Sequence, residues 1–409
     1  MSTAQALAIL RERIVTVTAD HLETVPLSGA LGRILAQDVT SRMDVPPHDN
    51  SAVDGYALRH GDLAADHPTS LPIQGRSAAG HPFDQALDMG ATVRIFTGAP
   101  MPSRADTVVM QEDVRRGENL ITIPPGLKPG ANRRCRGEDT QVGDVVLRRG
   151  RRLRPQDLGL AASIGRAELP LFRRLRVGVF STGDELAEPG APLPPGAVYD
   201  ANRQILCALI NGLGAEVSDL GILPDQAPAV RDGMEAGAKT HDLLVTSGGV
   251  SVGEEDHVRG AVEALGHLNF WKVAIKPGRP LALGQIGDAA FMGLPGNPVA
   301  AMVCFLRFAR PLILGLAGAT DLEPVLYRVI SGFDYQKKAG RREWLRAKLE
   351  PGPDGGRDGG LRAVLFRPQG SGIIKSLVQT HGLVEIGEDV TEIKAGEPVD
   401  FLPYDEVAL

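Results

Sequence analysis

The stretch HDLLVTSGGVSVGEEDHVRGAVEAL, residues 241–265, decides the fold class of this chain. HDLLVTS is an apolar, β-branched run that is typical of a buried strand, and HVRGAVEAL has the spacing of an amphipathic helix. The glycines between them provide a short loop. A strand that passes through such a loop directly into a helix is the repeating unit of a parallel α/β sheet.

The same alternation extends over residues 175–316. Short apolar runs alternate with longer segments in which apolar residues recur at helical spacing. We therefore expect a doubly wound, mostly parallel α/β domain. The expected strands are LRVGVFST (175–182), AEVSDLGIL (215–223), HDLLVTS (241–247), NFWKVAI (269–275) and AFMGL (290–294), and the expected helices are ANRQILCALINGL (201–213), residues 226–239, HVRGAVEAL (257–265) and NPVAAMVCFLRFARPLIL (297–314).

The rest of the chain has other patterns, so we expect a multidomain α/β plus β protein. Residues 3–15 read as an amphipathic helix, and residues 33–38 as a short second one. β-type runs between Pro/Gly turns return near the C-terminus without a strong helix, which predicts a small barrel or sandwich. The expected domains are an N-terminal helical/linker domain (1–40 with 146–174), an inserted β-rich domain (41–145), the α/β domain (175–323) and a C-terminal β-barrel-like domain (324–409).

Composition excludes several classes of protein. Lys and Arg number 44 and Asp and Glu 50, for a formal net charge of −6, which argues against a broad basic surface for nucleic acid. The 3 cysteines form no CxxC pair, so we expect neither disulfides nor structural zinc, and we expect each to be a small buried side chain. The N-terminal apolar run is too short for a signal peptide, and no stretch approaches the roughly 20 apolar residues of a spanning helix. We expect a soluble, cytoplasmic protein.

Three strand ends of the predicted sheet carry residue types that bind phosphate. Ligands of open α/β sheets bind at the carboxyl ends of strands, where glycines let the backbone approach and helix N-termini direct amides at an anion. Alternatively, the glycines only form tight turns and the acids only cap helices. Because the ends share one sheet, we favour one pocket. Its candidates are Ser181, Thr182, Gly183 and Glu185, then Ser247, Gly248, Gly249 and Ser251, and finally Pro295, Gly296, Asn297 and Pro298.

The segment WKVAIKPGRPLALG, residues 271–284, adds positive charge. On one strand, Lys272 and Lys276 would point to the same face. The Pro-Gly turn would aim Lys276 and Arg279 at one place, which favours an anion clamp. The alternative is a solvated sheet edge with charged side chains.

Acidic residues occur at the same strand ends, and Glu254, Glu255 and Asp256 directly follow the glycine loop. Carboxylates repel phosphate oxygens unless a cation lies between them. Mg²⁺ is bound by one or two carboxylates together with substrate phosphates. The sequence therefore predicts a metal-assisted phosphate site, in which the acids contact the metal.

The β-rich region has its own candidate, PPHDNSAVDGYAL, residues 46–58. Asp49, Asn50, Ser51 and Asp54 crowd polar groups directly before an apolar strand. Ordinary turn chemistry is the alternative, since Asp, Asn and Ser are common in turns. Two similar strings are FTGAPMP, which contains Thr97, and RGEDTQVGD, which contains Asp139.

Taken together, the strings PPHDNSAVDGYA, FTGAPMP, GEDTQVGD, STGDEL, TSGGVSVGEEDH, KPGRPLA and LPGNPV resemble, in order and spacing, the MoeA family. These are the molybdopterin molybdenumtransferases of molybdenum-cofactor synthesis, and they include the gephyrin E domain. The resemblance covers essentially the whole chain. It implies a reaction in which molybdate is inserted into adenylylated molybdopterin and AMP is released with the help of Mg²⁺. It also implies a homodimer with the active cleft between the α/β domain of one subunit and the β-rich domain of the other.

The resemblance also implies roles for individual residues. Glu185 and Asp256 should hold Mg²⁺ or position the attacking oxygen, and Asp54 should reach in from the partner subunit as a general base or metal-positioning group. Three departures from the family pattern are His48, Val53 and Arg279, where Phe, Met and Lys are usual. The carried-over residues are Asp54, Thr97, Asp139, Glu185, Asp225, Asp256, Lys272, Lys276 and Ser371, with Gly248, Gly249 and Ser251 cradling phosphate and Lys272, Lys276 and Arg279 neutralising the anions.

Two other functions remain as alternatives. The α/β unit also resembles the MogA-type adenylyltransferases, which make the adenylylated substrate but are about one domain long. A scaffold like gephyrin would need partner-binding surface beyond the enzyme core. The extra β domains favour insertion over adenylylation, and the sequence does not distinguish molybdate from tungstate.

Overall fold

The computed structural model describes residues 1–16, 21–250, 257–352 and 360–407. Ser251 and Asp256 therefore lie outside the described residues. The chain forms two compact units. The four domain boundaries expected above remain a prediction. The first unit consists of Met1–Gln37, Arg149–Arg154 and Pro170–Leu409, and the second of Asp38–Arg148 and Pro155–Leu169.

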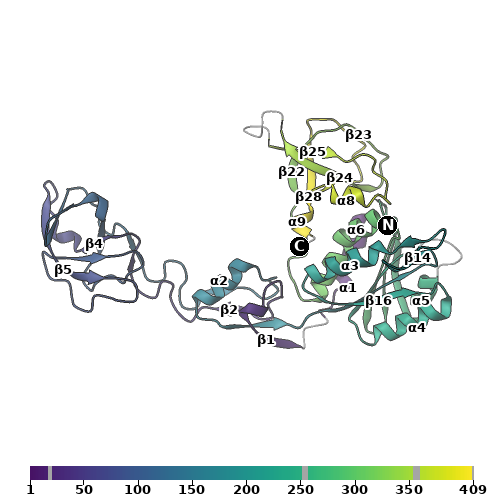
Figure 1. Cartoon of the computed structure of the whole chain (residues 1–409), viewed down its shortest axis with the longest axis horizontal. Helices are drawn as coiled ribbons and strands as arrows, with labels where there is room; N and C mark the ends of the chain where they lie inside the picture. Colours follow the sequence, from purple (N-terminus) through teal and green to yellow (C-terminus); the bar gives the residue numbers. More distant parts are fainter. Residues whose placement is uncertain (17–20, 251–256, 353–359, 408–409) are drawn as a thin grey trace. The chain divides into compact units, whose positions relative to one another are not determined.

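A six-stranded sheet forms the centre of the first unit (Figure 1). Its first three pairings, from β16 to β21, are parallel, and the last two are antiparallel. The expected doubly wound, mostly parallel α/β fold is confirmed. In spatial order the strands are β16 (Glu216–Leu223), β13 (Arg176–Thr182), β17 (Leu243–Ser247), β21 (Ala289–Leu294), β20 (Pro280–Ile286) and β18 (Gly266–Lys272).

Helices cover both faces of this sheet because successive strand residues point to opposite sides. Val177 and Val179 of β13 pack in one core with α3 (Ala201–Gly212). Phe180 packs in a second core with α4 (Ala227–Ala238) and α5 (His257–Leu265). Strands β13 and β17 are buried almost throughout, which explains why these two segments read as continuous apolar runs in the sequence.

One long helical segment, Pro298–Leu316, is buried on all sides. It comprises α6 (Pro298–Cys304), a π-helical turn η4 (Phe305–Ala309) and α7 (Arg310–Leu316). Its 19 residues are long and apolar enough to cross a membrane, so our estimate that no stretch approaches that length was wrong. However, 94 % of its apolar window is buried inside the protein, as is typical of a core helix that is hydrophobic all round. It shares a core with α1 (Thr3–Arg13) and the C-terminal region.

The C-terminal region is a closed barrel, one of the two expected architectures. Its strands follow the order β24 (Arg342–Pro351), β25 (Leu361–Leu365), β22 (Tyr327–Ser331), β28 (Pro398–Pro403) and β26 (Gly382–Ile386), and β26 pairs with β24 to close it. Closure leaves no unpaired edge. The short elements around it are β19 (Ile275–Lys276), β23 (Tyr335–Gln336), β27 (Glu392–Ile393), α8 (Lys375–Val378) and α9 (Tyr404–Val407).

The second unit is β-rich, as expected. Its main sheet has the order β7 (Thr107–Met110), β4 (Gly55–Leu58), β6 (Thr92–Ile95), β5 (Thr69–Ser77), β9 (Leu120–Ile123) and β8 (Arg115–Arg116). Two small ladders pair β3 with β10 and β2 with β11. The remaining elements of the chain are β1 (Leu22–Pro26), η1 (Leu27–Gly29), β2 (Val39–Thr40), β3 (Asn50–Ser51), η2 (His60–Asp62), η3 (Gln111–Asp113), β10 (Arg133–Arg134), β11 (Val145–Leu147), α2 (Pro155–Ser163), β12 (Glu168–Phe172), β14 (Leu186–Ala187) and β15 (Val198–Tyr199).

Three local predictions were wrong. Residues 33–38 are not helical, because Ile34 and Leu35 form β-bridges with Arg152 and Leu171 and are buried in that extended conformation. Long-range pairing outweighs local helix propensity here. Residues 280–286, which are not among the expected strands, form strand β20. Of the cysteines, Cys304 is buried and Cys207 is partly buried, but Cys135 is exposed.

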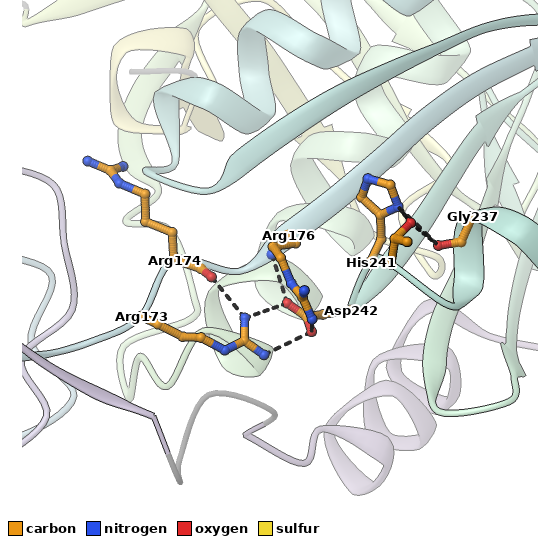
Figure 2. A network of polar contacts seen from close by, with 7 residues as sticks. Arg173, Arg174, Arg176, Gly237, His241 and Asp242 are labelled. Atoms are coloured by element: carbon orange, nitrogen blue, oxygen red, sulfur yellow. Dashed lines mark hydrogen bonds and ion pairs between the residues drawn. The ribbon is translucent and has the colours of Figure 1, made fainter.

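A buried carboxylate fixes the amino edge of the sheet. Asp242, before β17, has a side chain only 7 % exposed. Figure 2 shows Arg173 and Arg176 converging on it. Arg173 donates through Nη1 (2.7 Å) and Nη2 (2.9 Å), and Arg176 donates through its backbone N–H (2.8 Å) and Nη2 (3.2 Å). Burial opposes ionisation, but the hydrogen bonds from Arg173 and Arg176 outweigh it and lower the pKa of Asp242.

We expect Asp242→Asn to lower the free energy of unfolding by about 3 kcal/mol at pH 7, because removing one partner of a buried ion pair leaves the other uncompensated. Chemical denaturation followed by tryptophan fluorescence measures the change. Asp232→Asn is the control, since Asp232 is 65 % exposed and its pair with Arg231 should contribute less than about 1 kcal/mol.

The pH dependence of this difference has a defined sign. Because the pKa of Asp242 is lowered by folding, its stabilisation is complete above the ordinary aspartate pKa of about 4 and is lost as the pH falls through the folded value. The difference in free energy of unfolding between wild type and Asp242→Asn should therefore decrease below pH ~4. A gap that stayed constant down to pH ~3 would contradict the role of the charge.

Candidate functional site

A cavity of about 1110 Å³ lies at the carboxyl edge of the α/β sheet. The ends of three parallel strands meet there in register, with Ser181 opposite Ser247 and Ser247 opposite Leu294. The barrel supplies the facing wall, including Trp344 and Ser371. This is the edge at which ligands of open α/β sheets bind.

Two glycines after β17 form part of the lining. Gly248 has φ +93° and Gly249 has φ +63°, a region that favours glycine. A Cβ on Gly248 would lie 2.9 Å from the carbonyl oxygen of Thr182, and one on Gly249 would lie 2.6 Å from Cγ2 of Thr182. The backbone of Gly248 and Gly249 is therefore closely packed against Thr182 and also lines the cavity.

An asparagine that the sequence analysis missed joins the strand ends. Asn202 Nδ2 donates to Ser247 Oγ (2.8 Å) and to the carbonyl of Gly296 (2.7 Å). Ser247 Oγ in turn donates to the carbonyl of Pro295 (3.1 Å). Asn202 stands in the first turn of α3, whose N-cap is Asp200. That cap pattern, Asp-Ala-Asn, is the signal that could have directed attention to it.

The barrel wall also contains residues that the sequence analysis missed. Arg346 is 1 % exposed; its Nε donates to Ser376 Oγ (3.0 Å) and its Nη2 to the carbonyl of Gly370 (2.9 Å). Burial lowers the pKa of Arg346. The adjacent Ser371 accepts a backbone hydrogen bond from Val299 of α6 (3.0 Å). The barrel loop is therefore tied to the helix that begins at the cavity, and Arg341 lines the same wall.

The prediction that Lys272 and Lys276 share one strand face was wrong. Lys272 ends β18, is exposed, and is not among the described residues that line the cavity. The chain then turns, with the N–H of Ile275 bonded to the carbonyl of Val273 (3.0 Å). Lys276 belongs to β19, which pairs with β24 of the barrel. The alternation of side chains along a strand does not continue across this turn. The two ammonium groups therefore lie on different strands, and of the two lysines only Lys276 is among the described residues that line the cavity.

The charges on the cavity wall favour an anion. Its cationic side chains are Lys276, Arg279, Arg341 and Arg346. Among the described residues of the lining, the acids are Glu185 and Asp200, and Asp200 is 2 % exposed and paired with Arg203 (3.0 Å). Glu185 is exposed. A water-accessible cavity with excess positive charge concentrates anions.

Most predicted residues of the α/β domain gather at this cavity. Glu185, Gly248, Gly249, Lys276, Arg279, Pro295, Gly296, Asn297, Pro298 and Ser371 line it. Thr182 lies behind this lining and donates to Asp225 Oδ1 (3.1 Å). The remaining residues of that backing layer are Ser181, Gly183 and Ser247, which are buried.

The metal prediction remains a prediction. Within the described ranges, no group of three or more His, Cys, Asp or Glu side chains could hold a metal ion. Glu185 lines the cavity, whereas its expected partner Asp256 lies outside the described residues.

In the second unit, Asp54 and Thr97 form a pair. Asp54 Oδ1 accepts from the backbone N–H (2.8 Å) and the hydroxyl (2.7 Å) of Thr97. These bonds, with the nearby charge of Arg94, lower the pKa of Asp54. A lowered pKa makes this carboxylate a weak base and a persistent negative charge. Asp139 lies in an exposed loop, where its N–H donates to the carbonyl of Val45 (2.9 Å).

An arginine–aromatic stack near this pair was also missed by the sequence analysis. The guanidinium of Arg94 lies 4.7 Å from the ring centre of Phe96 and 4.9 Å from that of Tyr56. Arg76 lies 4.7 Å from the ring centre of Phe96. Arg94 also donates to the carbonyl of Gly55 (3.0 Å), next to Asp54. The stack orients positive charge beside the Asp54 carboxylate.

Comparisons with known proteins agree along the whole chain. A family model described as "MoeA N-terminal region (domain I and II)" matches residues 1–165. One described as "Probable molybdopterin binding domain" matches residues 178–315, and one described as "MoeA C-terminal region (domain IV)" matches residues 328–404.

Curated relatives and a solved structure are similar over nearly their full lengths. The molybdopterin molybdenumtransferase of Haemophilus influenzae is 41% identical over 387 residues, 94% of each chain. Molybdopterin molybdenumtransferase 2 of Mycobacterium tuberculosis is 35% identical over 382 residues, 91% of this chain and 93% of the relative. The crystal structure of the molybdopterin biosynthesis moeA protein of Pyrococcus horikoshii superposes with a TM-score of 0.83 at 29% identity, covering 99% of this chain and 100% of that one.

The two glycine loops allow a matched test of the cavity lining. Gly249→Ala should lower the free energy of unfolding by about 2–4 kcal/mol, because it combines a positive φ with overpacking against Thr182 and Val258. Gly296→Ala should cost less than about 1 kcal/mol, because the nearest atom to its Cβ is 3.7 Å away. Calorimetric unfolding of both variants measures the difference. Equal losses would show that the loop after β17 is not held as described.

Proposed function

Because this chain belongs to the MoeA family, we propose that it is a molybdopterin molybdenumtransferase. Molybdenum from molybdate bonds to the two dithiolene sulfurs of adenylylated molybdopterin and the displaced molybdate oxygens leave as water, while water hydrolyses the phosphoanhydride bond and AMP leaves. The observation that carries this proposal is the cation-lined cavity at the carboxyl edge of the sheet. Both substrates are anions, so one positively charged cavity suits both.

The residues at the strand ends bind and orient the nucleotide-linked phosphate. Gly248 and Gly249 present open backbone, and Gly296 and Asn297 lead into the N-terminus of α6. Backbone N–H groups at a helix start bind phosphate oxygens without any change in conformation. Asn202 keeps these loops at a fixed separation through its two hydrogen bonds.

The cations of the barrel wall bind molybdate and neutralise charge that develops on the phosphate. Lys276 and Arg346 face the same cavity from different segments. Arg346 is held by Ser376 and Gly370, so it binds an oxyanion with little loss of side-chain entropy. Ser371 adds a hydroxyl donor to the same wall. Molybdate and tungstate are both compatible with this set of donors.

The donor chemistry at Glu185 fits Mg²⁺. This ion needs only one or two carboxylates when substrate phosphates complete its shell, and Glu185 supplies an exposed carboxylate at the cavity. Asp256 is the expected second ligand. When bound, Mg²⁺ supplies charge neutralisation at the phosphate.

Asp54 acts as a fixed negative charge in this proposal. Its hydrogen bonds from Thr97 lower its pKa, which favours the metal-positioning role over the general-base role.

We infer that the protein is a homodimer, in which Asp54, Thr97 and Asp139 of one subunit complete the cavity of the other. We also infer that it acts in the cytoplasm, where cysteines such as Cys135 remain reduced.

The extra structure around the α/β domain weighs against the two alternatives. An adenylyltransferase needs only the α/β domain, yet here Arg341, Arg346 and Ser371 of the barrel form a wall of the cavity. A scaffold would not need a cavity with a cationic lining. Molybdenum insertion uses all of these features.

We expect Glu185→Gln to lower kcat by about 100-fold, because it removes a cavity carboxylate that organises charge at the phosphate. The measurement is AMP released from adenylylated molybdopterin, Mg²⁺ and molybdate. Asp184→Asn is the control, because Asp184 is an exposed acid in the same loop that does not belong to the described cavity lining. Molybdopterin and ATP should give no adenylylated product; if they do, adenylyltransferase activity is favoured instead.

Mixing two inactive subunits tests the dimer. Neither Asp54→Asn nor Glu185→Gln homodimers should be active. Mixed dimers would contain one intact site if the cavity is completed by the partner, so random mixing should restore about one quarter of the wild-type rate. A mixture as inactive as its components would mean that each site is built from a single chain.

A further inference from the structure

A buried carboxylate, Glu343, lies directly behind the cationic wall of the cavity. Its side chain is 0 % exposed. Oε2 accepts from the hydroxyl of Tyr335 (2.7 Å) and from the ammonium of Lys276 (3.2 Å), and Oε1 accepts from Nε of Arg341 (2.8 Å). Lys276 and Arg341 both line the cavity. One anion therefore contacts two cavity cations.

Backbone pairing of two strands also places Lys276 beside Glu343. β19 pairs in parallel with the start of β24, with Ile275 opposite Arg342 and Lys276 opposite Glu343. Ile275 is fully buried, which anchors the short strand. The N–H of Arg342 also donates to the carbonyl of Ala274 (3.1 Å). Strand register therefore brings Lys276 and Glu343 side by side, and the hydrogen bond between their side chains orients the ammonium.

Burying a charge is unfavourable unless it is paired. Burial opposes ionisation of Glu343, but hydrogen bonds from Tyr335, Lys276 and Arg341 outweigh it and lower the pKa of Glu343. Glu343 is therefore an anion at neutral pH because of these partners. In return, the anion limits the positions that the two cationic side chains adopt.

We propose that Glu343 is a positioning residue of this site: it fixes the Lys276 ammonium where the anionic groups of the substrates bind. This inference rests on the proposed function, which places phosphate and molybdate in the cavity. An ammonium has three N–H donors. Two contact Glu343 and Tyr335, which leaves the third for an anion in the cavity that Lys276 lines.

The effect of neutralising Glu343 should fall on kcat. Glu343→Gln keeps the size of the side chain but removes the anion, so the cavity gains net positive charge and still attracts oxyanions. The orientation of Lys276 is lost, and small misplacements of a catalytic group cost up to about 100-fold in rate. We expect kcat to fall about 10- to 100-fold while the KM for molybdate changes less than about threefold.

Glu385 provides a matched control in the same barrel. Its side chain is 6 % exposed and accepts from Arg342 (2.6 Å) and from the uncharged wall residue Trp344 (2.9 Å), but neither Glu385 nor Arg342 is one of the described residues that line the cavity. Glu385→Gln should lower the melting temperature about as much as Glu343→Gln. Its kcat should stay within about twofold of wild type, because it orients no cavity cation.

The experiment measures AMP release and melting temperature for Glu343→Gln, Glu343→Asp, Glu385→Gln, Lys276→Gln and the double variant Glu343→Gln/Lys276→Gln. If Glu343 acts through Lys276, the Glu343→Gln/Lys276→Gln variant should be no slower than Lys276→Gln alone. Glu343→Asp, which keeps the charge, should recover part of kcat. If Glu343→Gln does not fold, Tyr335→Phe replaces it, with an expected decrease in kcat of about threefold that disappears in the Lys276→Gln background.

The outcomes separate the two proposals. A normal kcat for Glu343→Gln beside an impaired Lys276→Gln overturns the positioning role and leaves the proposed function intact. Additive losses in the Glu343→Gln/Lys276→Gln double variant overturn it in the same way. Full activity of Lys276→Gln overturns the role of Lys276 itself, and the positioning role with it.

Discussion

The burial of one apolar helix, residues 298–316, constrains the whole first unit. Phe305, Leu306 and Phe308 are each 0 % exposed, and the core around them includes residues of the sheet, of α1 and of the barrel. Because a helix that is apolar all round must be covered on every side, these three parts pack on a common centre. The same helix begins at the cavity. The packing that stabilises the unit therefore also positions Gly296 and Asn297, which precede the helix and line the cavity.

The cavity combines two kinds of support. On the sheet side, parallel strands end at one level, and hydrogen bonds between Asn202, Ser247 and the neighbouring carbonyls hold their loops together. On the barrel side, buried polar groups such as Arg346 and Glu343 are held in place by hydrogen bonds within the protein. A site of this kind is organised before any ligand arrives, which lowers the cost of binding charged groups from water.

The sequence predicted what depends on local pattern. Strand β17, its glycine loop and helix α5 follow from periodicity alone, and so does the gathering of Ser247 and Gly296 at one edge. Predictions failed where distant segments decide the outcome. The extended conformation at Ile34 depends on Arg152, and the separation of Lys272 from Lys276 depends on the pairing of β19 with β24. The barrel cations were missed because nothing near them in the chain indicates which face they occupy.

The two-residue strand β19 has a consequence for how this chain tolerates change. Side chains alternate across a strand, so a shift by one residue would turn Lys276 to the opposite face and bring a neighbour against Glu343. The segment that leads from the end of β18 to the start of β20 is therefore constrained in residue type at the buried Ile275 and at the cavity residue Lys276. Its length is also constrained. We expect an insertion or deletion there to break the contact between Lys276 and Glu343, even at a position that is exposed to water.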